Sequence, residues 1–219
     1  ETAGAALVSH RGVKAISFTG STAVGHRIAA TCADQFKKVT LEMGGKNPAL
    51  VFPDAPAQAL KTLVRSAFQN SGQICLCGSR ILIHRAIYED FKHAFVSEAE
   101  RLKIGPPSDP ETQLGPVMSE PHFRKVLSYI ALAREEGGNI LCGGDRVEPA
   151  ECGGWFIAPT VIEGLPMGSR FCQDEIFGPV VSLHAFDDDN HALALANQSR
   201  YGLAASVWTN DLARAHRMA

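Results

Sequence analysis

One cysteine has the residue type and the setting best suited to chemistry in this chain. Cys75 follows the polar run 69–73, at the end of a helical pattern, and precedes a strand-like run that starts at Arg80. Small residues leave the backbone around it open, so a substrate can reach the thiol and the thiol can lose its proton. Cys77 would point the opposite way in an extended segment. Most cysteines are buried and structural, but a position in a turn between elements favours Cys75 as a nucleophile.

A carboxylate with room to move lies upstream of the cysteine. Glu42 stands beside the two glycines Gly44 and Gly45. A glutamate at a strand end is just as often an ordinary surface residue. Next to flexible backbone, however, it can act as a general base, and a thiol nucleophile with a separate base is what catalysis through a thioester requires. Because 33 residues separate Glu42 from Cys75, the two can meet only through the fold.

A third candidate is the turn that contains Gly20, Ser21 and Gly25, between a predicted strand over 13–18 and a predicted helix over 26–33. A glycine turn that leads into a helix can bind a phosphate through backbone N–H groups and the helix dipole. The segment has neither the G-x-G-x-x-G nor the G-x-x-x-x-G-K-[ST] pattern, so it is neither a standard dinucleotide fingerprint nor a P-loop. A turn that merely connects two elements is the alternative.

Composition excludes several classes of function. The 219 residues are 45% hydrophobic and 20% charged, and the formal net charge of −2 predicts no nucleic-acid or lipid partner. No apolar run is long enough to cross a bilayer. Six scattered cysteines without a C-x-x-C pair favour a reducing, cytoplasmic setting over a disulfide framework. Eight histidines without metal-ligand spacing predict no zinc site.

Strand patterns alternate with helical ones along the chain, which predicts an α/β fold with a largely parallel sheet. Asp54 with Pro56 predicts a helix start, and Ser119 is expected to cap a later helix. Residues 156–162 read as one strand. Asn47 is expected to shape the turn after the glycines.

Several ordered motifs resemble the aldehyde dehydrogenase superfamily. They are F-T-G-S-x-x-x-G at 18–25, L-E-M-G-G-K at 41–46, G-Q-x-C at 72–75, E-I-F-G-P at 175–179 and N-x-x-x-Y-G-L-A-A at 197–205. The resemblance implies an aldehyde dehydrogenase-like fold, with residues 1–43 as the tail of a Rossmann-type NAD-binding domain. Residues 44–219 would be the catalytic domain, truncated at its C-terminus. The chain is then expected to be an inactive fragment of a longer enzyme that forms a homodimer or homotetramer.

The resemblance also implies roles for cofactor-binding residues, with NAD as the expected cofactor and NADP left open. Gly20, Ser21 and Gly25 would lie near the cofactor pyrophosphate. Glu175 would bind the nicotinamide ribose, and Phe177 would pack near the nicotinamide.

The catalytic roles follow from the same resemblance. Cys75, rather than Cys77, fits the family pattern and would attack an aldehyde to form a thiohemiacetal and then a thioester, while Glu42 would activate the water that releases the acid. Residues 74–81 and 104–110 resemble the 2-aminomuconic semialdehyde dehydrogenase branch. Two alternatives stay open: an enzyme that passes the acyl group to coenzyme A, which Glu42 disfavours, and a non-catalytic protein that keeps the fold.

Overall fold

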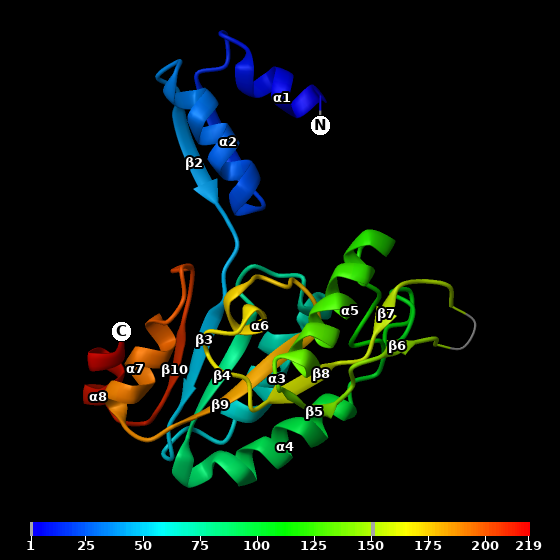
Figure 1. The fold of residues 1–219 in the computed structure, drawn as a ribbon, viewed down its shortest axis with the longest axis vertical. Helices are drawn as coiled ribbons and strands as arrows, with labels where there is room; N and C mark the ends of the chain where they lie inside the picture. Colours follow the sequence, from blue (N-terminus) through cyan, green and yellow to red (C-terminus); the bar gives the residue numbers. More distant parts are fainter. Residues whose placement is uncertain (1, 150–151) are drawn as a thin grey trace. The chain divides into compact units, whose positions relative to one another are not determined.

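The computed structural model describes residues 2–149 and 152–219, which form two compact units, Glu1–Gly45 and Lys46–Ala219. The first unit is a small β-α-β arrangement with a preceding helix (Figure 1). Its elements are α1 (Thr2–Ser9), β1 (Ala15–Thr19), α2 (Thr22–Ala33) and β2 (Lys38–Glu42). Strands β1 and β2 pair in parallel, with Thr19 opposite Glu42.

The second unit is built on a six-stranded sheet in the order β10-β3-β4-β9-β8-β5. All its neighbouring strands are parallel except the edge pair β5 and β8. The strands are β3 (Asn47–Val51), β4 (Gly78–His84), β5 (Asn139–Cys142), β8 (Thr160–Glu163), β9 (Val180–Phe186) and β10 (Ser206–Trp208). The predicted α/β fold with a mostly parallel sheet is therefore confirmed.

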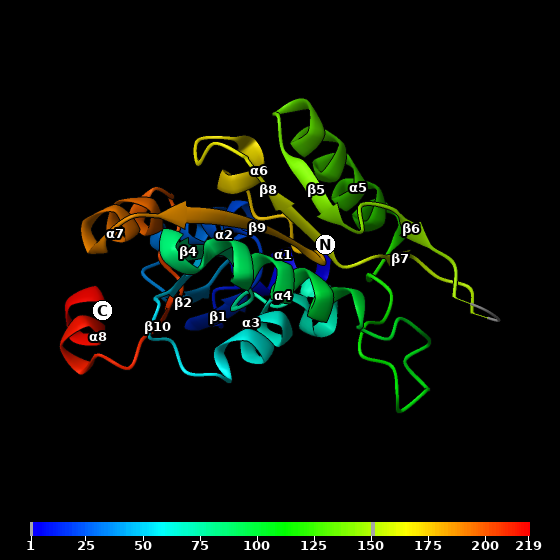
Figure 2. The same ribbon diagram turned by 90° about the horizontal axis from the view of Figure 1, so that it is seen from below.

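Helices cover both faces of this sheet because its inner strands are apolar on both sides. The helical segments are α3 (Ala59–Phe68), η1 (Gln69–Gly72), η2 (Arg85–Ile87), α4 (Tyr88–Glu100), α5 (Glu120–Glu135), α6 (Arg170–Gln173), α7 (Asp189–Asn197) and α8 (Leu212–Met218). Val51 and Ile83 belong to the core cluster under α3 and α4, whereas Leu50 and Leu82 belong to the cluster under α7 and α8. Helices α3 and α4 run side by side (Figure 2).

Two local predictions were wrong. Asp54 does not start a helix: α3 begins at Ala59, and the Asp54 carboxylate accepts hydrogen bonds from the Thr209 hydroxyl and the Asn210 backbone N–H. Asp54 is thus used to fasten a distant loop. Residues 156–162 form two strands, because Phe156–Ile157 (β7) pairs with Arg146–Val147 (β6) before β8 joins the main sheet. Ser119 caps α5 as expected.

The loop after α3 fits directly against the loop before β9. A Cβ atom at Gly72 would lie 1.9 Å from the carbonyl oxygen of Gly178, and Gly72 has φ +71°. A Cβ at Gly178 would in turn lie 2.6 Å from the side chain of Val126 on α5. Only glycine allows backbones to approach this closely in that conformation, so the segment that leads to Cys75 is held against the 174–179 loop.

We expect Gly72→Ala to destabilise the protein by about 3 kcal/mol, from strain at positive φ together with a clash that the backbone of Gly178 cannot relieve. Gly137→Ala is the matched control, because Gly137 has φ +88° but open space around its missing Cβ. It should lose only about 1 kcal/mol. Urea unfolding of both variants measures the difference. Equal losses would show that the close approach of the two loops does not contribute to the free energy of unfolding.

Candidate active site

Cys75 lies in a tight turn between η1 and β4, as a half-buried free thiol. The backbone N–H of Cys77 donates to the carbonyl of Ile74 at 3.0 Å, which closes the turn. The opposite directions expected for Cys75 and Cys77 assumed that this segment is extended, as in a strand. That assumption was wrong, because the segment is a turn. The turn is short because β4 begins at Gly78, directly after Cys77.

One side-chain amide fixes this turn. Asn47, the first residue of β3, is 4% exposed, and its Nδ2 donates to the carbonyls of Cys75 at 2.7 Å and Cys77 at 3.0 Å. Its Oδ1 accepts from the backbone N–H of Ala204 at 3.2 Å. The sequence suggested only a turn-shaping role for Asn47. In the structure it links the cysteine turn to the sheet and to the segment before β10.

The segment before Cys75 has an unusual left-handed backbone. Asn70, Ser71 and Gly72 have φ values of 52°, 55° and 71°. Side-chain contacts compensate this conformation: the hydroxyl of Ser71 donates to the carbonyl of Gly115 at 2.6 Å, and Oε1 of Gln73 accepts from the N–H of Met118 at 2.9 Å. Non-glycine residues adopt such angles only where their surroundings enforce them, most often at functional sites.

The environment of Cys77 disfavours its thiolate. Burial raises the pKa of the Cys77 thiol to about 11, with a smaller contribution in the same direction from Cys75. Because the thiolate is the reactive form of a cysteine, Cys77 is a poor nucleophile at neutral pH. This supports the choice of Cys75 within the Cys-Leu-Cys sequence.

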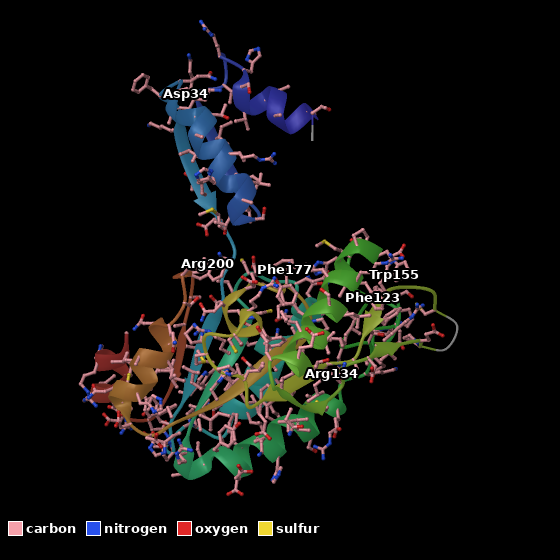
Figure 3. All side chains as sticks on the ribbon, viewed as in Figure 1. Asp34, Phe123, Arg134, Trp155, Phe177 and Arg200 are labelled. Carbon is pink, nitrogen blue, oxygen red and sulfur yellow. The ribbon has the colours of Figure 1, made fainter. Side chains whose placement is uncertain are left out.

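The loop with Glu175 and Phe177 belongs to the same unit as Cys75 and meets the cysteine segment through Gly72 and Gly178. Phe177, labelled in Figure 3, has φ +63°, and its carbonyl lies 2.6 Å from Nε2 of His122 on α5. The Nζ of Lys125, also on α5, donates to the carbonyl of Glu175 at 3.0 Å. Side chains of helix α5 therefore hold this loop by two main-chain carbonyls of the loop.

A group of buried cations supports the start of β3. Arg80 is 1% exposed and donates from Nε to the carbonyl of Lys46 at 2.8 Å, while its other nitrogens donate to the carbonyls of Leu195 and Ala196 at the end of α7. Burial lowers the pKa of Lys46 to about 7 and that of His184 to about 4. Near neutral pH, His184 is uncharged and Lys46 is close to losing its charge. The cost of burying several positive groups is thereby reduced.

The first unit contains four other predicted site residues. The N–H of Gly20 donates to the carbonyl of Glu42 at 3.0 Å, and Ser21 caps α2 by accepting from the N–H of Val24 at 3.4 Å. Glu42 is exposed. Gly25 is needed for packing, because a Cβ there would lie 2.6 Å from the sulfur of Met43. The exposed end of a twelve-residue helix beside Gly20 and Ser21 fits a phosphate-bearing ligand.

The described residues offer neither a metal site nor a membrane span. Within residues 2–149 and 152–219, no group of three or more His, Cys, Asp or Glu side chains could hold a metal ion. Among the helices described, none is long and apolar enough to span a membrane.

Known proteins resemble this chain along its whole length. The sequence pattern of the aldehyde dehydrogenase family matches residues 1–219. The 2-aminomuconic semialdehyde dehydrogenase of Danio rerio is 46% identical over 222 residues, which cover 99% of this chain and 46% of that protein. The 5-carboxymethyl-2-hydroxymuconate semialdehyde dehydrogenase of Escherichia coli is 44% identical, with 100% of this chain and 47% of that protein covered.

The fold is shared as well. A crystal structure of betaine aldehyde dehydrogenase from Staphylococcus aureus in complex with NAD+ matches with a TM-score of 0.94 at 36% identity, over 98% of this chain and 43% of that one. The chain spans about half the length of the curated relatives it matches. The resemblance inferred from the ordered motifs is confirmed, and the chain belongs to the aldehyde dehydrogenase family.

Proposed function

We propose that the protein that contains this chain oxidises an aldehyde to a carboxylic acid, with Cys75 as the nucleophile and NAD as the cofactor. The observation that carries the proposal is the Cys75 turn. A half-buried thiol lies in a turn whose two cysteine carbonyls are held by Asn47, beside a partner thiol that stays protonated. A crystallised relative binds NAD+, and in another crystal structure of that enzyme a cysteine is modified by BME, which supports a reactive thiol in this family.

Each residue has a defined task in this proposal. The thiolate of Cys75 forms a bond to the aldehyde carbon, and the carbonyl oxygen gains the negative charge. The backbone N–H of Cys75 is suited to stabilise that oxyanion, because the turn holds the peptide still. NAD+, when bound, would supply the acceptor for the hydride of this carbon, and Cys75 would then carry the acyl group as a thioester. Glu42 takes a proton from water, which attacks the thioester and releases the acid and the thiolate.

Two regions of this chain would hold the cofactor. The exposed start of α2, with Gly20 and Ser21, suits the pyrophosphate, while Gly25 leaves room for the side chain of Met43 beside that helix. Glu175 and Phe177 would take the nicotinamide ribose and the nicotinamide, on a loop that α5 holds by its carbonyls. The family resemblance supports these assignments.

The substrate class follows from the named relatives. Two of them are called dehydrogenases of 2-aminomuconic semialdehyde and 5-carboxymethyl-2-hydroxymuconate semialdehyde. Both names describe an aldehyde on a short carbon chain that also carries carboxylate. We propose a substrate of this kind, in a cytoplasmic homodimer or homotetramer. The six cysteines are all free, as a reducing compartment would keep them.

In the full-length enzyme, Cys75→Ala should abolish NAD reduction with any aldehyde, because no other described thiol takes part. Cys77→Ala should retain most of the activity, since that thiol is protonated at neutral pH. Steady-state assays of both variants, with circular dichroism to confirm folding, make the comparison. A Cys75→Ala enzyme that turns over normally contradicts the proposal.

Glu42→Gln should slow hydrolysis of the thioester by roughly 10²–10⁴-fold, the usual contribution of a general base. Hydride transfer would continue for one turnover, so a burst of NADH followed by a slow steady state is expected. Stopped-flow absorbance and intact-protein mass spectrometry detect the burst and the acyl adduct. Product formation that depends on added coenzyme A would instead identify an acyl-transferring enzyme.

The two neighbouring thiols should differ in alkylation. Since the pKa of Cys77 is raised to about 11, only about one part in a thousand of it is thiolate near pH 8, and its labelling should rise tenfold per pH unit above that. Iodoacetamide at about pH 8 should therefore label Cys75 first, as peptide mapping by mass spectrometry can follow. Cys77→Ser should leave that labelling unchanged. Preferential labelling of Cys77 would reverse the assignment of the nucleophile.

A further inference from the structure

A groove of about 480 Å³ lies between α3 and α4, entirely within the second unit. We call it the α3–α4 groove (Figure 2 shows the two helices adjacent). Its apolar floor is formed by Val64, Phe68 and Leu102. None of the residues assigned to catalysis or cofactor binding lines this groove.

The charges that line the α3–α4 groove are mostly positive. Lys61, Arg65 and Arg101 contribute cations, and Glu98 contributes one carboxylate. Glu98 is already paired with Arg101 at 2.7 Å. Across the part of the chain that the structure describes, Lys61 and Arg65 have no ion-pair partner. The groove therefore presents two uncompensated cations beside an apolar surface.

One end of the α3–α4 groove, at Gln69, lies beside the turn that contains Cys75 and Cys77. Three of its lining residues follow one another at intervals of four: Lys61, Arg65 and Gln69. They therefore form a stripe along one side of α3 that continues to Gln69, directly after the helix. One helical turn, about 5.4 Å, separates successive members. At the end of the stripe, the carbonyl of Gln69 lies 4.0 Å from the sulfur of Cys77 in the catalytic turn.

We infer that the α3–α4 groove receives the carboxylate end of the aldehyde substrate and that Arg65 is the residue that binds it. The guanidinium of Arg65 can form two parallel hydrogen bonds to a carboxylate. Lys61 adds a second positive charge one turn further from the thiol, and the carbon chain of the substrate covers the partly exposed side chain of Leu102. This inference rests on the proposed function, since it assigns the substrate specificity of the same Cys75 site.

The test compares two aldehydes of equal length in the full-length enzyme: adipic semialdehyde, which has a terminal carboxylate, and hexanal, which has none. Arg65→Gln should lower kcat/KM for adipic semialdehyde by about 10–100-fold, the usual loss for a charge-assisted pair, and leave hexanal within about twofold. Arg65→Lys should recover part of the loss because it keeps the charge. Adipate should inhibit the parent enzyme competitively and the Arg65→Gln enzyme weakly.

The control is Arg124→Gln on α5. Arg124 is paired with Glu120 and does not line the α3–α4 groove, so this variant should keep kcat/KM unchanged for both aldehydes. If Arg65→Gln fails to fold, Lys61→Gln gives the same comparison with a smaller expected effect. An equal loss for both aldehydes, or no loss for either, overturns the role of Arg65 while the oxidation itself stands. A parent enzyme that oxidises neither aldehyde and keeps Cys75 unacylated would instead count against the proposed function.

Discussion

The arrangement of this site depends on the side chain of one buried residue, Asn47. A carboxamide has two donor hydrogens and an acceptor oxygen, and Asn47 uses both kinds. Its NH2 group binds the carbonyls of Cys75 and Cys77, and its oxygen binds the N–H of Ala204. Two segments that are remote in sequence, the turn with Cys75 and the segment before β10, are thereby both bound to the first residue of β3. An aspartate would lose the donors and a leucine would lose all three bonds.

The position of Asn47 depends in turn on Arg80. The guanidinium of Arg80 is almost fully buried, and its hydrogen bonds go to backbone carbonyls. One of these carbonyls belongs to Lys46, the residue before Asn47. A buried charge without a carboxylate partner is better tolerated when it is hydrogen-bonded, and here the end of α7 supplies carbonyls for the other two nitrogens. The neighbouring Lys46 and His184 are shifted towards their neutral forms by burial. The cluster therefore stabilises the register of β3 with little net repulsion.

Cations have two different uses in this unit, and burial separates them. Arg80 is enclosed, and each of its three nitrogens donates to a backbone carbonyl. Arg65 is exposed on the outer side of α3 and has a free guanidinium at the edge of the α3–α4 groove. In the same way, burial raises the pKa of the Cys77 thiol within the turn that it shares with Cys75. A residue type alone does not decide function here; its solvation and its partners do.

Much of this protein followed from the sequence because the signals are local. The alternation of strands and helices gave the parallel α/β class, and the order of the motifs gave the family and singled out Cys75, Glu42 and the 175–179 loop. The sequence did not reveal that Asp54 fastens Thr209, that Asn47 binds both cysteine carbonyls, or that Gly72 is required by Gly178. Those contacts join residues that are remote in the chain, and only chain packing brings them together. The same holds for the groove beside Arg65: periodicity places a cation on the outer face of α3, but a groove exists only where a second helix packs against it.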